Sequence, residues 1–465
     1  MAMGKRRARQ QALWVAAAEI TRGPGHPFYR ALNKALEEAG FDPFVERLCA
    51  PFYAEKLGRP SVPPAVYFRL LLIGYFEGID SERGIAWRVA DSLTLREFLG
   101  YRLTDTPPDH STISRNRRLI SVEAHREVFG WVLKVLAQGG LVRGKTLGVD
   151  ATTLEANAAL RSIVRRDSGE SYQEYLLELA QASGIETPTR EDLARLDKNR
   201  RGKGSNDDWQ HPHDPDARIT KMKDGRTHLA HKAEHAVDLD TGAVVAVTVQ
   251  AADLGDTESL AQSVEEAKGQ LADVLEDEAA ARQMSQTVLA ELVADKGCHS
   301  NAVHTEYDEQ GIRTYVSEPN RGRRRWRNQA KARKAVYGNR RRIRGERGKA
   351  LLRRRGERVE RTFAHCYDTG GMRRTHLRGH DNIYKRTLVH VAGFNLGLLL
   401  RQKLGFGSPR GLQGRLGRVL ALLLALRGHL RASHRLLQHL ADGIAQLIAL
   451  SACRSTAHQP LWVAA

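Results

Sequence analysis

Cysteine and long apolar runs are scarce in this sequence of 465 residues. It has four cysteines (Cys49, Cys298, Cys366 and Cys453), and no two form a C-x-x-C pair. This pattern argues against a disulfide scaffold or a zinc site made of four cysteines and predicts a reducing compartment. The longest apolar run near the C-terminus covers eight residues, 419–426. A membrane-spanning helix needs about 18, so we expect no membrane-spanning segment.

The N-terminal segment imitates a secretion signal but is short for one. Basic residues between Lys5 and Arg9 precede an apolar stretch at residues 12–18, which ends at Glu19. Seven residues lie at the lower limit for the apolar core of a signal peptide. We therefore expect a cytoplasmic protein.

Acidic residues are outnumbered, and the excess charge is concentrated in one segment. The chain has 73 Lys and Arg against 54 Asp and Glu, a formal net charge of +19, and its pI is about 10.0. Residues 321–361 hold 19 of the basic residues and only three Glu. Such an excess predicts a polyanionic partner, and nucleic acid is the commonest.

The length predicts two or three domains. We expect a helical domain at 1–140, a mixed α/β domain at 141–400 with an insertion at about 155–226, and a helical extension at 401–465. The expected helices are 63–76, 81–91, 154–182 and 258–275, and residues 197–226 are expected to form a loop. The expected strands are 145–150, 228–238, 243–251, 287–295 and 311–316, of which the second and third form a hairpin.

A basic helix follows two prolines, Pro107 and Pro108, and Asp109 or Ser111 can cap it. Its first turns contain short polar side chains and three arginines, Arg115, Arg117 and Arg118. These side chains suit contacts with DNA phosphates or bases. A solvated basic helix is an equally good interpretation.

Three separated carboxylates are the candidates for catalysis. Asp150 and Asp295 each end an expected buried strand, and Glu360 lies on a helix within the basic segment. Carboxylates that meet in a fold repel one another by several kcal/mol at an effective dielectric of about 20. Protons or divalent metals must neutralise them, and oxygen ligands favour Mg²⁺ or Mn²⁺. Two such ions suit phosphodiester chemistry.

Each feature alone has a plainer interpretation. A single Asp at a strand end is more often a cap or a turn residue, and a basic run is often a solvated surface. The sequence His211-x-His213-Asp214-x-Asp216 could be a metal cluster, but a polar loop is favoured. A zinc site made of Cys298–His299 and His365–Cys366 is less favoured still. Asp253 and Asp256 could be supporting carboxylates. The combination of acids and arginines carries the argument.

The three acidic motifs, taken in order, resemble those of a known family. Gly-Val-Asp150-Ala-Thr, Val-Ala-Asp295-Lys-Gly and Val-Glu360-Arg-Thr-Phe are similar to the acidic signatures of bacterial insertion-sequence DDE transposases. Residues 62–118 and the Gly-rich stretch 370–379 also resemble that family. The likeness spans roughly residues 40–400.

The resemblance implies a fold, a reaction and partners. The fold would be α/β, an RNase H-like mixed sheet flanked by helices, with an all-α N-terminal domain and a helical C-terminal extension. Asp150, Asp295 and Glu360 would be both catalytic residues and the ligands of two Mg²⁺ or Mn²⁺ ions. The enzyme would cleave transposon ends at terminal inverted repeats and join them to target DNA, as a homodimer on DNA in the nucleoid. The expected DNA contacts are Arg115, Arg117, Arg118, Lys296, Arg324, Arg325, Arg353, Arg355 and Arg361.

The sequence departs from the family pattern at three positions. Cys298 stands where an aromatic residue is frequent, Gly356 where an arginine is frequent and Tyr367 where a lysine is frequent. Glu357, which has Arg353 four residues before it, rivals Glu360 as the third acid. Two other functions remain open: a nucleic-acid-binding protein without catalysis, and a metal-dependent nuclease without strand transfer.

Overall fold

A computed structural model describes residues 25–54, 61–199, 204–222, 224–320, 322, 324–412, 423 and 426–427. The signal-like stretch at 12–18, Cys453 and most of the expected extension at 401–465 lie outside these residues. None of the helices in the described ranges is long and apolar enough to cross a membrane.

Helices form the N-terminal part of the described chain, as the sequence predicts. They are α1 (Pro27–Glu38), α2 (Phe41–Cys49), α3 (Pro64–Glu77), α4 (Glu82–Ala90), α5 (Leu93–Phe98), α6 (His110–Leu119) and α7 (Val122–Gln138). The predicted proline start of α3 is confirmed, and the side chain of Asp109 caps α6 by accepting from the Ser111 backbone N–H. Helix α3 is buried on almost every side, because α15 (His380–Leu404) packs along it.

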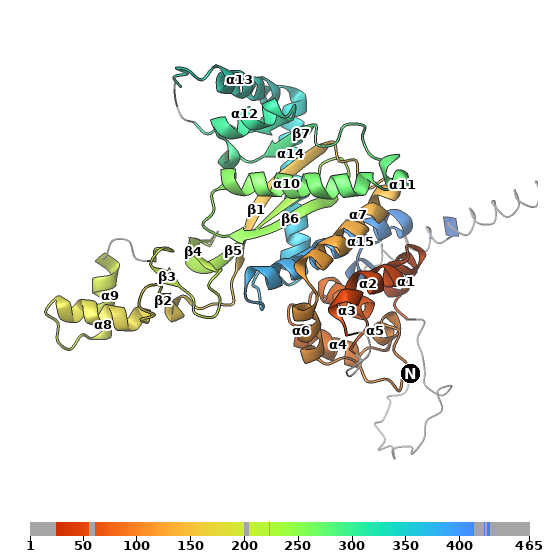
Figure 1. The fold of residues 1–465 in the computed structure, drawn as a ribbon, viewed down its shortest axis with the longest axis horizontal. Coiled ribbons are helices and arrows are strands. Elements are labelled where there is room, and N and C mark those ends of the chain that lie inside the picture. The colour runs from red at the N-terminus through yellow and green to blue at the C-terminus, as the bar shows by residue number, and fades with distance from the viewer. Residues whose placement is uncertain are drawn as a thin grey trace, which may run out of the picture.

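A six-stranded mixed sheet forms the centre of the molecule (Figure 1). Its path is β4-β5-β1-β7-β8, and β6 pairs with the same edge of β5 as β4. The strands β1 and β5 are antiparallel, whereas β1, β7 and β8 run parallel. The bounds are β1 (Thr146–Glu155), β4 (Arg218–Lys221), β5 (Thr227–Asp238), β6 (Val244–Ala251), β7 (Glu291–Ala294) and β8 (Arg313–Val316).

Two long helices cover opposite faces of this sheet. Along β5, Glu234 contacts α10 (Asp256–Leu275), whereas the next residue, His235, contacts α14 (Glu346–Phe363). Because successive side chains of a strand point to opposite faces, α10 and α14 lie on opposite sides. The α/β class and the RNase H-like arrangement of a mixed sheet flanked by helices are confirmed.

The remaining elements surround this core. Helices α12 (Asn301–Glu309) and α13 (Ala330–Arg344) pack against each other and against β8. Helices α8 (Tyr172–Ala182) and α9 (Arg190–Asn199) project away from the sheet (Figure 1). A two-stranded ribbon, β2 (Val164–Arg165) with β3 (Trp209–Gln210), connects that projection to the core. The short α11 (Glu278–Ala281) precedes β7, and a π-helical turn, η5 (Ala364–Thr369), continues α14.

Several predicted elements need correction. The first strand does not end at Asp150 but continues to Glu155, because Thr152 and Leu154 are also buried in the sheet. The helix expected at 154–182 is confined to α8, and the loop expected at 197–226 contains β3 and β4. The hairpin β5–β6 and the helix α10 are confirmed within two residues, whereas β7 and β8 are shorter than predicted.

Candidate active site

Asp150 and Asp295 lie side by side on neighbouring parallel strands. Gly148 of β1 pairs with Val293 of β7, and both acids follow their paired residue by two positions. Asp295 begins the short helical turn η4 (Lys296–Cys298) directly after β7. The structure therefore brings together two acids that are far apart in the sequence.

One arginine bridges the two carboxylates. Arg355 of α14 places Nη1 2.7 Å from Oδ2 of Asp150 and Nη2 3.5 Å from Oδ1 of Asp295. Its side chain is only 13% exposed, and its Nε makes no hydrogen bond among the described residues. Mutual repulsion between the acids is thus offset by an internal cation.

A glycine in β1 lets this arginine reach the acids. A Cβ at Gly148 would lie 2.6 Å from Cδ2 of Leu239 and 3.1 Å from Cγ of Arg355. A larger residue would have to displace the buried side chain of Leu239 and would crowd that of Arg355. The Gly in the first acidic motif is therefore a packing requirement for the approach of Arg355.

The two carboxylates have different surroundings. Burial raises the pKa of Asp150, and the nearby charge of Asp295 raises it further, while Arg355 and the Ala151 backbone N–H act in the opposite direction. Asp295 is more open to solvent, with a side chain that is 52% exposed. Asp150 is thus half-buried, whereas Asp295 is exposed to solvent.

The third acid is less closely placed. Glu360 is exposed on α14, and its carboxylate makes no hydrogen bond or ion pair within the described part of the chain. Glu357 is also exposed and is bound by Arg361 at 2.8 Å. Across the described ranges, no three His, Cys, Asp or Glu side chains lie close enough together to hold a metal ion. The structure assembles the two aspartates without closing the triad.

Helix α14 is fixed beside Asp150 by a buried histidine that the sequence analysis missed. His235 lies opposite Asp150 in the β1–β5 register and contacts the Thr362 hydroxyl at 2.8 Å and the Tyr367 hydroxyl at 2.6 Å. Thr362 already donates to the Val359 carbonyl, so Nδ1 of His235 donates to Thr362 and Nε2 accepts from Tyr367. Burial lowers the pKa of His235 to about 3, which keeps the ring neutral. Tyr367, at the position of the family's lysine, is therefore structural.

The nine predicted DNA contacts fall into two groups. Six side chains are exposed: Arg115, Arg118, Lys296, Arg325, Arg353 and Arg361. Three are engaged inside the protein: Arg117, Arg324 and Arg355. Arg117 is buried between Glu82 and Asn382, and Arg324 binds Glu318 at 3.1 Å. Structural roles are favoured for these three arginines, because each is largely buried against a carboxylate, whereas Arg361 pairs with Glu357 on the exposed surface.

The rival clusters have other roles. Asp214 is fully buried and accepts from the Gly379 backbone N–H at 3.1 Å, while its other oxygen lies 3.3 Å from Nε2 of His231. Asp216 accepts from the His380 backbone N–H at 3.0 Å. These contacts attach the 211–216 segment to the start of α15. Cys298 and Cys366 are both buried as free thiols, and no zinc cluster forms in the described ranges.

The acid pair fits divalent ions by its chemistry. Its donors are carboxylate oxygens, which Mg²⁺ and Mn²⁺ prefer. The guanidinium of Arg355 stands between the acids, so this position already attracts positive charge. Asp150 and Asp295 would therefore hold a cation if Arg355 moved aside.

Two family models match the chain. Residues 204–396 match the family model described as "Transposase DDE domain", and residues 17–119 match the "Transposase domain (DUF772)". Asp295 and Glu360 lie inside the first match, and Asp150 lies between the two. No curated protein and no solved structure matches the chain.

The fold and the matched catalytic domain define a class, the nucleic-acid-cleaving enzymes with an RNase H-like DDE core. The N-terminal match narrows this class. The chain belongs to the DDE transposases of insertion sequences and is a DNA transposase. Membership in this family implies dependence on a divalent metal.

Proposed function

We propose that the protein cleaves phosphodiester bonds at the ends of its own insertion sequence and transfers the freed 3′ ends into target DNA. Asp150, Asp295 and Glu360 are the proposed catalytic residues and ligands of two Mg²⁺ or Mn²⁺ ions. The observation that carries the proposal is the pair of adjacent aspartates bridged by Arg355. Two carboxylates on neighbouring strands supply the oxygen donors that divalent ions prefer.

The chain's own residues position the reactants. Half-buried Asp150 and exposed Asp295 would fix the position of the divalent ions. When bound, the divalent ions would supply Lewis-acid stabilisation of the attacking and leaving oxygens. We expect exposed Arg353 and Arg361 on α14, together with Lys296 after Asp295, to hold the phosphates of the DNA strand.

The assignment of Glu360 as third acid rests on its place on α14. It lies between Val359, which is fully buried, and the end of the helix that His235 fixes beside Asp150. Glu357 is already engaged by Arg361. For Glu360 to join the aspartates, Arg355 would have to be released and α14 would have to turn or shift, because residues five positions apart point to different sides of a helix.

The DNA substrates define the proposed partners. We propose double-stranded terminal inverted repeats and target DNA as substrates, with one protomer on each of two paired ends and the complex in the nucleoid. Sedimentation of the protein with end DNA should give two protomers for each pair of ends. A complex with one protomer would contradict this part of the proposal.

Cleavage of end DNA tests the function. Purified protein, Mg²⁺ and a DNA fragment that carries one end of the element should give a nick at that end. Asp295→Asn should lower the cleavage rate about 1000-fold and leave DNA affinity nearly unchanged. Asp273→Asn, which changes an exposed aspartate of α10, is the matched control. Wild-type cleavage by Asp295→Asn would overturn the assignment.

A further inference from the structure

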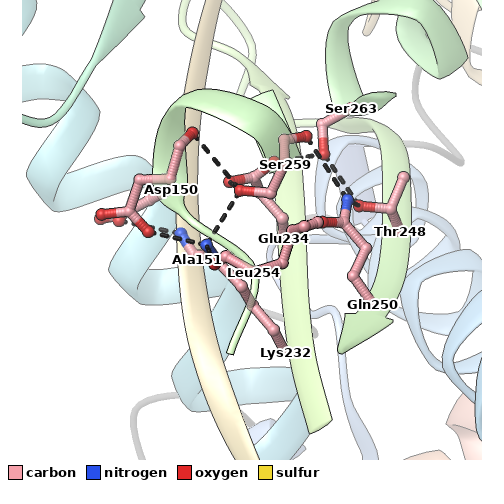
Figure 2. Close-up of polar contacts among 10 residues, drawn as sticks. Asp150, Ala151, Lys232, Glu234, Thr248, Gln250, Leu254, Ser259 and Ser263 are labelled. Atoms are coloured by element: carbon pink, nitrogen blue, oxygen red, sulfur yellow. Dashed lines mark hydrogen bonds and ion pairs between the residues drawn. The ribbon is translucent and has the colours of Figure 1, made fainter. Parts of the chain in front are cut away.

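A buried polar network lies behind the acid pair, on the face of β5 opposite to α14. Figure 2 shows Lys232 and Glu234 of β5 meeting Ser259 and Ser263 of α10, beside Asp150 and Ala151 of β1. Glu234 is directly opposite Ala151 in the strand register. None of these side chains except that of Asp150 has a role in the proposed chemistry.

Lys232 is the central cation of this network. It is 5% exposed and donates to three oxygens, those of the Leu254 carbonyl at 3.1 Å, the Asp256 carboxylate at 2.7 Å and the Ser259 hydroxyl at 2.9 Å. A buried ammonium group is costly unless it is fully paired. Three donors with three acceptors meet that condition, so the position of Lys232 fixes the start of α10.

Glu234 ties the same helix to the sheet. Its two oxygens accept from the hydroxyls of Ser259, at 3.2 Å, and of Ser263. The Ser263 hydroxyl also lies 2.8 Å from that of Thr248 on β6. The first two turns of α10 are therefore held against β5 and β6 by buried polar contacts.

The start of α10 in turn touches the segment that follows Asp295. A Cβ placed on Gly297 would lie 2.2 Å from Oδ2 of Asp256. Real Cβ atoms do not approach so closely, so a side chain at position 297 would displace the carboxylate of Asp256 from its present place. The thiol of Cys298 lies in the same surroundings. Its pKa is raised to about 12, chiefly by burial and then by the charges of Glu234, Asp256 and Asp150.

We propose that Lys232 is a positioning residue for Asp295. By holding Asp256 against Gly297, it fixes the turn η4 and with it the carboxylate of Asp295. The inference deepens the proposed function and rests on it for its effect on catalysis. Its structural half, the coupling of Lys232 to η4, is independent of any activity.

Hydrogen exchange tests the structural half. Lys232→Met removes the ammonium group and keeps most of the side-chain volume. We expect exchange at the backbone amides of residues 296–299 to become at least about tenfold faster, because the local opening energy falls. Lys268→Met is the matched control. Lys268 is itself a residue of α10, but it pairs with Glu265 and Gln310 and not with Asp256. Unchanged exchange in Lys232→Met would overturn the proposal.

Kinetics test the catalytic half. Lys232→Met should lower the cleavage rate at saturating DNA by about 10–100-fold, the usual cost of losing support behind a metal ligand. The dissociation constant for end DNA should change less than about twofold, because the side chain of Lys232 is buried. Lys232→Arg should recover part of the rate. A loss confined to DNA affinity would contradict a positioning role.

A double mutant tests the contact itself. Gly297→Ala adds the methyl group that Asp256 excludes, and Asp256→Ala makes room for it. If the contact transmits the effect, the double variant should be no slower than Asp256→Ala alone. Multiplicative losses would show that the two residues act separately and would overturn the route through Asp256. If the wild-type protein does not cleave at all, the proposed function fails, while the exchange experiment still decides the coupling.

Discussion

Two carboxylates lie on opposite faces of the central sheet, and their partners differ. Glu234 is 1% exposed and is held by the hydroxyls of Ser259 and Ser263, with Lys232 nearby. Asp150 faces α14, is half-buried, and has the long side chain of Arg355 as its main partner. Burial raises the pKa of both carboxyls, so their environments differ in their partners and not in the direction of the shift.

The difference separates support from reactivity. Short hydroxyl groups from a packed helix fix Glu234 in a single arrangement. Arg355 has several rotatable bonds, its Nε is unpaired among the described residues, and its guanidinium spans two acids that an ion could take over. The face of the sheet that carries Asp150 is suited to catalysis, because an ion can replace Arg355 there. The face that carries Glu234 supports it through fixed contacts with α10.

The largest expected effect concerns the third acid on the reactive face. Glu360→Gln should lower the rate of end cleavage about 1000-fold, whereas Glu357→Gln should stay within a few-fold of wild type because Glu357 pairs with Arg361 on the surface. Single-turnover cleavage assays with saturating DNA measure both rates. The opposite pattern would transfer the role to Glu357.

The replacement of the Arg355 guanidinium by a metal ion can be tested through the change in Tm on adding metal. Arg355→Gln leaves the two aspartates without their cation, so Mn²⁺ no longer competes with an internal charge. Adding Mn²⁺ should raise the Tm of the variant by roughly a few °C more than that of wild type. Arg353→Gln, an exposed neighbour on α14, should respond like wild type. An equal shift in all three proteins would rule out competition between Arg355 and the ion.

A smaller effect is expected from the exposed arginines. Arg325→Ala and Arg353→Ala should each reduce the slope of log affinity against log salt concentration by about 0.9, since each removes one phosphate contact. Fluorescence anisotropy with labelled end DNA gives these slopes. Arg282→Ala, whose side chain pairs with Glu278 on α11, is the control. A slope that stays the same in both variants would remove these arginines from the DNA interface.

The smallest expected effect concerns the stability contribution of the buried carboxylate, Glu234. The raised pKa of Glu234 means that the folded state binds a proton more readily than the unfolded chain. The stability of wild type relative to Glu234→Gln should therefore increase as the pH falls from 7, and be greatest below about 4.3, the ordinary value for Glu. Urea unfolding across this range measures the gap. A gap that widens at high pH instead would contradict the buried placement.

Parts of the fold follow directly from local sequence. The turn at Asp240–Gly242 between two apolar runs predicts the β5–β6 hairpin, and the apolar run before Asp295 predicts β7. Pro64 and Asp109 mark the starts of α3 and α6. These features depend on residues that are neighbours in the chain, so the sequence is enough to find them.

Other parts depend on contacts between distant segments. Asp150 lies within its strand because β5 pairs with β1 well beyond it, as far as Glu155. The bridge from Arg355 to two strands requires the packing of α14 against Gly148. Lys232 and Glu234 look like solvent-facing residues in the sequence, but α10 covers that face of the sheet. Motifs identify the acids, and only tertiary packing shows what holds them.

Manganese in a crystal would test the central claim most directly, because its anomalous scattering locates the ion without reference to activity. We predict a Mn²⁺ ion bound by carboxylate oxygens of both Asp150 and Asp295, with the guanidinium of Arg355 displaced from between them. Crystals that contain Mn²⁺ elsewhere, with Arg355 still bridging the two aspartates, would contradict it.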